Sequence, residues 1–191
     1  MKLAFMTEIN KIEDVKLKKA AKAMTKDAPE YFWHIAASST GKYHPKCDLG
    51  EGGLIRHSIM VSTVCDDLIA AEIFCRDTQV IRDTAKIAAL FHDVIKQGPV
   101  DENGNHSSHT EFLHPKYAEE FVKSHLEDAK VDDLKISMIC QAISTHMGKW
   151  CVGYNRKDRL SKPRTDFEKL IHTADYIASR KYIVGLENWT F

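Results

Sequence analysis

The chain has 191 residues, of which 27 are basic and 27 acidic, so its formal net charge is zero. This length suits one domain with a sizeable hydrophobic core, and we expect residues 1–191 to form a single domain. The balanced charge argues against general binding to nucleic acid or to an anionic membrane surface. Ten histidines are a large number for this length.

Apolar residues recur at helical spacing through most of the chain. One or two helices are predicted between Glu8 and Ala37, interrupted by Pro29. Five further segments carry an apolar stripe, at about 54–68, 80–91, 115–126, 136–147 and 167–182. The residues that mark predicted helix starts or ends are Asp77, His114 with Pro115, Thr165 with Glu168, and Gly148. Strand patterns are few and short, so the sequence predicts an all-α fold, a compact helical bundle with long loops.

Three long connections separate the predicted helices, at 38–53, 97–113 and 148–165. Long loops in a compact domain are usually functional or disordered. The first contains Tyr43, His44 and a glycine-rich stretch at 50–53, and these residues could border a pocket because glycine lets the backbone approach a ligand. The third carries six cations, from Lys149 to Arg164, against one acid.

The five cysteines are scattered and form no C-x-x-C pair. Such a set suits reduced thiols in a cytoplasm. The apolar run at the N-terminus is too short for a signal peptide, and no later stretch has the length needed to span a bilayer. We therefore expect a cytoplasmic protein without a membrane partner.

Four predicted helices each direct a potential metal ligand toward the interior. His57 shares the apolar stripe of its helix, His92 and Asp93 end an almost wholly apolar segment, and His146 and Asp175 extend two further buried faces. Taken singly, each histidine is explained more simply as a hydrogen-bonded core residue. A buried carboxylate without a partner is costly, however, and helix bundles build metal sites from inward side chains of facing helices. Together, these residues favour a metal site.

The order of these residues resembles the HD-domain metal-dependent phosphohydrolases. The stretch AALFHDVIK at 88–96 is similar to their signature, an apolar helix that runs into His-Asp, often with a lysine three residues after the Asp. GGLIRHS at 52–58 and LIHTAD at 170–175 resemble the segments that carry their first histidine and last aspartate. The resemblance covers about residues 52–181, and N-terminal helices and a loop precede it at 1–51.

The resemblance implies a set of metal ligands, with two-metal members of the family placing additional ligands between the His-Asp pair and the last aspartate. In this chain the set is His57, His92, Asp93, His114, His146 and Asp175. Asp93 would bridge two ions, although Ile95 stands where a glycine is common in the two-metal signature. For His114, a role as helix cap beside Pro115 is equally consistent with the spacing. Mixed imidazole and carboxylate ligands suit one or two ions of Mn²⁺, Fe²⁺, Co²⁺, Ni²⁺ or Zn²⁺, and Mg²⁺ less well.

The family resemblance also implies catalytic roles for Asp93 and Lys96, with Lys96 binding a phosphate oxygen or the leaving oxygen. The basic loop supplies further candidates for substrate binding, by phosphate contact or by stacking on a base. The complete set of predicted substrate contacts is Lys96, Arg56, Trp150, Tyr154, Arg156, Lys157 and Arg159. A solvated lid without any ligand explains the basic loop equally well.

The expected activity is hydrolysis of a phosphate ester. Neutral overall charge favours a small nucleotide over an extended nucleic acid, which requires a broad cationic groove. The first expectation is a 5′-(deoxy)nucleotide monophosphatase. The GGL-x-x-H segment and the extra histidines also resemble phosphodiesterases and 3′–5′ exoribonucleases of this superfamily. An HD-type di-iron oxygenase and a non-catalytic nucleotide-binding regulator remain as further alternatives.

Overall fold

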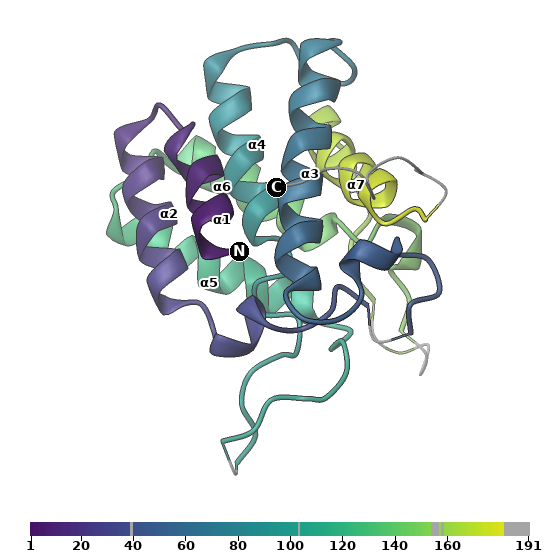
Figure 1. The fold of residues 1–191 in the computed structure, drawn as a ribbon. Coiled ribbons are helices and arrows are strands. Elements are labelled where there is room, and N and C mark those ends of the chain that lie inside the picture. Colours follow the sequence, from purple (N-terminus) through teal and green to yellow (C-terminus); the bar gives the residue numbers. More distant parts are fainter. Residues whose placement is uncertain (39, 103, 154–156, 158, 182–191) are drawn as a thin grey trace.

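Helices form the whole framework of the fold, which confirms the all-α prediction (Figure 1). The computed structural model describes residues 1–38, 40–102, 104–153, 157 and 159–181. Within these ranges, the one β-type pairing is an isolated bridge between Val152 and Arg159. The elements in chain order are α1 (Lys2–Asn10), α2 (Val15–Asp27), η1 (Glu30–Trp33), η2 (Lys46–Asp48), α3 (Gly53–Ala70), α4 (Gln79–Phe91), α5 (His114–Asp128), α6 (Asp133–Thr145), η3 (Gly148–Trp150) and α7 (Asp166–Ala178).

Side-chain caps fix the first turns of several helices. The predicted capping residue Thr165 accepts a hydrogen bond from the Glu168 amide, at 3.2 Å, and α7 begins there. At α4 the predicted cap Asp77 is wrong, because Asp77 pairs with Arg82 and its neighbour Thr78 caps the helix instead. Each such cap stabilises a helix by about 1 kcal/mol.

Two helix starts differ from the prediction. The first helix begins at Lys2 rather than near Glu8, because burial of Phe5 and Ile9 against the core holds it in place although the segment has little amphipathic pattern. His114 is the first residue of α5 rather than its cap, and the cap position, Leu113, makes no side-chain hydrogen bond. The side chain of His114 is therefore available for a role other than capping.

The core lies between α3, α4 and the helices that flank them. In Figure 1, α3 and α4 run side by side, with α1 and α2 on one side and α7 on the other, and α3 packs against both α4 and α7. The Phe5 ring contacts Phe32, Trp33 and Phe91 edge to face, with centroids 5.4–5.8 Å apart. Fully burying one such ring contributes about 1.5–3 kcal/mol. The N-terminal helices therefore share one core with the rest of the bundle.

A buried ion pair joins three of these helices. Lys86 on α4 is only 5% exposed, and its ammonium group donates to Glu8 on α1 and to Ser62 and Asp66 on α3, at 2.8–3.0 Å. Glu8 also accepts a hydrogen bond from Lys11 at 2.6 Å. Removing the ammonium would leave Glu8 with one exposed partner.

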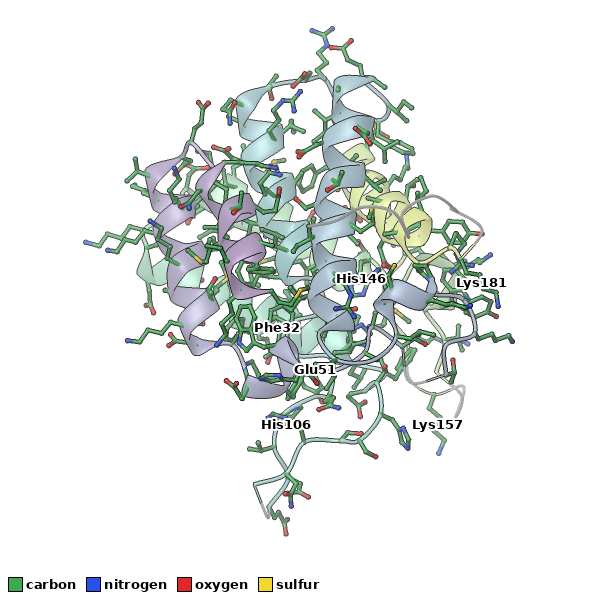
Figure 2. The ribbon with its side chains drawn as sticks, in the orientation of Figure 1. Phe32, Glu51, His106, His146, Lys157 and Lys181 are labelled. Atoms are coloured by element: carbon green, nitrogen blue, oxygen red, sulfur yellow. The ribbon has the colours of Figure 1, made fainter. Side chains whose placement is uncertain are left out.

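The loops at 97–113 and 148–165 follow the C-terminal ends of α4 and α6, and their described parts lie at that end of the bundle. The loop at 97–113 extends below the bundle in Figure 1, and Figure 2 places His106 on it, where its ring packs against Tyr31 at 4.5 Å. All five cysteines are free. No helix in the described part of the chain is both long enough and apolar enough to cross a bilayer.

Candidate metal centre

Five helices bring the six predicted ligands together at one end of the bundle. His57 lies one turn into α3, His92 and Asp93 follow directly after α4, and His146 follows α6. His114 begins α5, and Asp175 lies on α7. Each of the first five is at most 3% exposed, and the Asp175 side chain is 21% exposed. The fold therefore buries four imidazoles and one carboxylate around a second carboxylate that reaches solvent.

The ligand atoms of these residues face one another. Asp93 Oδ1 lies 2.9 Å from His114 Nε2 and 3.7 Å from His146 Nε2, and Asp93 Oδ2 lies 3.4 Å from His92 Nε2. Asp175 Oδ1 lies 3.0 Å from His57 Nε2 and 3.8 Å from His92 Nε2. The residues form three overlapping sets whose ligand atoms lie within 4.8 Å of one another, and His92, Asp93 and His146 each belong to two of them. This overlap suits a pair of ions that share ligands.

Hydrogen bonds to the backbone orient three of the rings. Nδ1 of His92, His114 and His146 lies 2.6–2.9 Å from the carbonyl oxygen three residues earlier in the chain. A carbonyl oxygen can only accept, so each Nδ1 carries the proton and each Nε2 presents a lone pair to the cluster. Such outer hydrogen bonds are typical of histidines that bind metals. The orientation of these rings therefore fits metal coordination.

Unpartnered polar atoms give a second test of that fit. Nε2 of His92 and Oδ1 of Asp93 are buried and have no hydrogen-bond partner. Nε2 of His114 and of His146 are 3.2 Å apart, and with both Nδ1 atoms donating elsewhere, their lone pairs face each other. Lone pairs at this separation repel unless a proton or a cation lies between them, and unpartnered buried groups are costly. The residues present therefore fit one or more divalent ions.

The electrostatics of the cluster keep both carboxylates and the His146 ring in the forms that bind cations, whereas burial of His92 is outweighed by Asp93 and Asp175, which raise the pKa of that ring. Burial alone would raise the pKa of Asp93, but the Lys96 ammonium and the rings of His92 and His114 outweigh burial and hold this pKa well below its ordinary value. Burial alone would also raise the pKa of Asp175, but the adjacent His57 and His92 rings outweigh burial and lower this pKa. Burial lowers the pKa of His146 to about 3, so this ring is neutral near neutral pH. Ionised carboxylates and neutral imidazoles are the ligand forms of these residues.

A cavity of about 450 Å³ opens beside the cluster. Its volume lies within the range of pockets that bind small molecules. The ligands His57, Asp93, His114, His146 and Asp175 line one part of it. The other lining side chains that bear on substrate binding are Tyr43, His44, Lys96, Phe112, Trp150 and Arg180.

The predicted substrate contacts divide into three groups. Lys96 is buried, lines the cavity and donates a hydrogen bond to Asp93 Oδ2. Trp150 lines the cavity and stacks on Tyr176, with ring centroids 5.7 Å apart. The other predicted contacts that the structure describes do not line it: Arg56, which donates to the Cys47 carbonyl oxygen, and the exposed Lys157 and Arg159. Figure 2 shows Lys157 at the edge of the molecule, away from His146. Tyr154 and Arg156 lie outside the described residues.

Other cavity residues were not predicted as contacts. Arg180 follows Asp175 by five residues and lies two residues beyond the end of α7, and its guanidinium lies over the rings of Tyr43 and Tyr176, at 4.9 Å and 4.3 Å. Phe112 comes from the loop before α5. A cation shortly after a predicted ligand is the signal that could have found Arg180, whereas no pattern marks Phe112.

His172, which the sequence left without a role, supports the cluster from outside. Its Nδ1 lies 2.7 Å from the carbonyl oxygen of His146. Its ring occupies the space that a Cβ atom at Gly148 would need, and Gly148 adopts a φ of +53°. Glycine is therefore required after α6 both by backbone conformation and by packing.

Comparison with known proteins agrees with this geometry. The family model described as the HD domain matches residues 54–180, about two thirds of the chain. No curated protein and no solved structure matches it. The matched range begins three residues before His57 and ends five residues after Asp175. The chain therefore belongs to the HD domain family, the metal-dependent phosphohydrolase superfamily.

Proposed function

We propose that this protein is a metal-dependent phosphohydrolase that cleaves the phosphate ester of a small nucleotide, with a 5′-(deoxy)nucleotide monophosphate as the first candidate. The observation that carries the proposal is the position of the metal centre, whose ligands form part of the wall of a cavity of about 450 Å³. A nucleoside monophosphate is of a size for such a cavity. The centre would hold one or two divalent transition metals, Mn, Fe, Co, Ni or Zn, or Mg.

Divalent ions in this cluster would lower the pKa of a coordinated water and neutralise charge on the phosphate oxygens. The protein's own residues would hold these ions and orient the substrate. Asp93 joins two of the ligand sets and also accepts from Lys96, so it connects the metal centre to a cation that lines the cavity. The Lys96 ammonium would contact a phosphate oxygen and stabilise charge that develops on it or on the leaving oxygen.

Aromatic and cationic side chains support a nucleotide as the substrate. Trp150 offers a flat surface for a base, and Lys149 lies over the Trp150 ring at 4.7 Å. Arg180 is held by hydrogen bonds to the Tyr176 carbonyl oxygen and to the Ser179 hydroxyl, at 3.2 Å and 2.8 Å. Oriented cations beside stacked rings are suited to binding an anionic aromatic ligand.

The test is a panel of nucleotides assayed with each divalent metal, in which released phosphate and chromatographic products are measured. Release of inorganic phosphate from dAMP, dGMP or dTMP supports the proposal. Activity confined to bis(p-nitrophenyl) phosphate, cyclic nucleotides or RNA ends would instead identify a diesterase. A reaction that requires iron and dioxygen would identify an oxygenase.

A matched pair of variants controls this assay. Asp93→Asn removes the shared ligand and should abolish phosphate release. Asp83→Asn removes another buried carboxylate, which lies near the start of α4, nine residues before His92, and accepts from the amides of Glu13 and Asp14; this variant should retain activity. Full activity of Asp93→Asn would refute the metal-dependent mechanism.

A further inference from the structure

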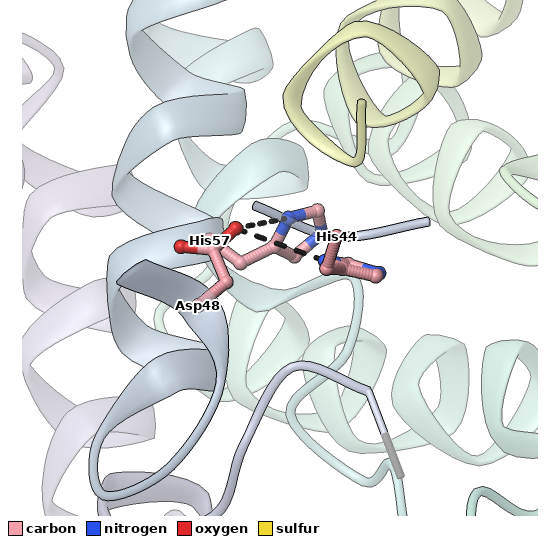
Figure 3. Close-up of side chains that lie close together, drawn as sticks. All are labelled: His44, Asp48 and His57. Atoms are coloured by element: carbon pink, nitrogen blue, oxygen red, sulfur yellow. Dashed lines mark ion pairs between the residues drawn. The ribbon is translucent and has the colours of Figure 1, made fainter. Parts of the chain in front are cut away.

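Three polar side chains meet beside the metal centre without hydrogen-bonding one another. Oδ2 of Asp48 lies 3.7 Å from Nδ1 of His44 and 3.9 Å from Nδ1 of His57 (Figure 3). All three atoms are buried and have no hydrogen-bond partner. Asp48 is 3% exposed and His57 is 1% exposed. Unpartnered buried groups of this kind need an explanation, because each costs about 1–3 kcal/mol.

His57 differs from the other three histidines in its position on its helix. His92 and His146 directly follow helices, and His114 begins one, so each Nδ1 faces a carbonyl oxygen that lies outside the regular i to i+4 ladder of the helices. His57 lies inside α3, where the preceding carbonyls belong to the helical hydrogen-bond ladder, and the Leu54 carbonyl also accepts from the Ser58 hydroxyl at 3.0 Å. An acceptor for Nδ1 of His57 must therefore come from another segment.

The loop before α3 supplies such an acceptor. The Asp48 carbonyl oxygen accepts from the Ala37 amide at 2.9 Å, and a Cβ atom at Gly53 would overlap that same oxygen. Arg56 also holds this loop, through the Cys47 carbonyl oxygen. Glycine at the start of α3 thus lets the loop lie directly against the helix, and the Asp48 carboxylate lies within 4 Å of the His57 ring as a result.

We propose that Asp48 is a positioning residue of the metal centre, which accepts a hydrogen bond from Nδ1 of His57 and so directs Nε2 toward a bound metal. The separation of 3.9 Å exceeds a hydrogen bond by about 1 Å, so the proposal requires the carboxylate to rotate about its terminal torsion, which is broad for Asp, when a metal binds. A carboxylate–histidine–metal arrangement fixes the ring and raises the basicity of the ligand nitrogen. Arg56, which held a predicted role in substrate binding, acts here by holding the loop that carries Asp48.

The same carboxylate oxygen faces His44, whose ring lines the cavity. A carboxylate oxygen can accept two hydrogen bonds, so Asp48 can orient both rings at once. In Figure 3 both Nδ1 atoms point toward one oxygen of Asp48. Asp48 therefore connects a ligand of the metal centre with a ring in the cavity wall.

The inference rests on the proposed function only in requiring a metal at His57, and its test is metal affinity without substrate. Purified protein is stripped with a chelator and titrated with Co²⁺, and binding is followed by the visible absorption of the bound ion. Asp48→Ala should weaken Co²⁺ binding about 10–100-fold, and Asp48→Asn, which retains an acceptor oxygen, should weaken it less. Asp83→Asn, the loss of a buried carboxylate outside the centre, should bind as the wild type does.

Far-UV circular dichroism verifies that each variant is folded, and Asp48→Asn carries the test if Asp48→Ala is not. Unchanged Co²⁺ affinity in the folded Asp48 variants would overturn the inference. A second explanation is that His44, Asp48 and His57 themselves hold an ion. His44→Ala tests it, because a loss of Co²⁺ affinity equal to that of Asp48→Ala would support this explanation and overturn the inference. A wild type whose Co²⁺ affinity depends on Asp48 as expected, but which hydrolyses no phosphate ester, would refute the proposed function and leave this inference standing.

Discussion

The substitution Asp93→Asn tests the metal centre through protein stability. A ligand that binds only the folded protein at 100 times its Kd adds about 2.7 kcal/mol to the free energy of unfolding. In a chain of this size, 1 kcal/mol shifts Tm by about 2–4 °C, so metal should raise the Tm of the wild type by about 5–11 °C. Asp93 belongs to two of the three sets that the six predicted ligands form, so among these sets its loss leaves only His92, His146 and Asp175 intact.

The expected loss of stabilisation can be estimated from the affinity. Loss of a partner outside the ligand set already weakens metal binding about 10–100-fold, and loss of a shared ligand should cost at least as much. A 100-fold weaker Kd at the same metal concentration leaves about 0.4 kcal/mol of stabilisation, a Tm shift of about 1–2 °C.

The assay is a thermal melt of wild type, Asp93→Asn and Asp83→Asn, each with chelator and with Mn²⁺ or Co²⁺. Asp83→Asn should melt lower than the wild type under both conditions, because it loses a buried acceptor, but it should keep the full metal-induced shift. A metal-induced shift in Asp93→Asn as large as that of the wild type would refute the assignment of Asp93 as a shared ligand.

Three further outcomes are expected. Lys86→Met should lower the free energy of unfolding in urea by about 2–4 kcal/mol, because it leaves the buried Glu8 with Lys11 alone, and a loss below about 1 kcal/mol would contradict this. Burial alone would raise the pKa of Glu8, but Lys11 and Lys86 outweigh burial and lower this pKa in the folded protein. The ionised Glu8 carboxylate therefore stabilises the fold fully above pH 4.5, and this stabilisation is lost as the pH falls through the pKa of Glu8 in the folded protein. Glu8→Gln should flatten that part of the stability–pH curve from urea titrations, and curves parallel to the wild type would count against it. Lys96→Met should lower phosphate release about 10²–10³-fold, because the charge on the phosphate loses its ammonium contact. Mn²⁺ binding should be unchanged or tighter, because the Asp93 carboxylate no longer pairs with Lys96, and weaker Mn²⁺ binding would argue for a structural role of Lys96.

Helical periodicity predicted those parts of the site that lie on regular faces. His57 and Asp175 occupy positions within apolar stripes, so burial of the stripe determines which way each side chain points. His146 and the His92–Asp93 pair lie where buried stripes end, and helices that pack on one core bring such ends together. The order of the motif then supplied the chemistry that periodicity alone does not indicate.

The residues that the sequence did not predict depend on contacts between distant segments. Asp48 has no helical pattern around it, and its importance follows only from the packing of its loop on Gly53. The start of α4 was misplaced by one residue because Asp77 and Thr78 are both good caps, and the choice depends on the ion pair between Asp77 and Arg82. Local sequence cannot rank alternatives that a tertiary contact decides.

The contact between Lys96 and Asp93 bears on whether the protein folds before or after it binds metal. The chain supplies its own positive charge to the most buried carboxylate of the centre, and the apolar core around Phe5 and Phe91 lies outside the ligand cluster. Domains whose ligands repel one another until an ion arrives fold only with their metal. Here Lys96 supplies counter-charge to one of the ligands, so we expect the bundle to fold before it binds metal, and metal supply to set the fraction of active molecules rather than the amount of folded protein.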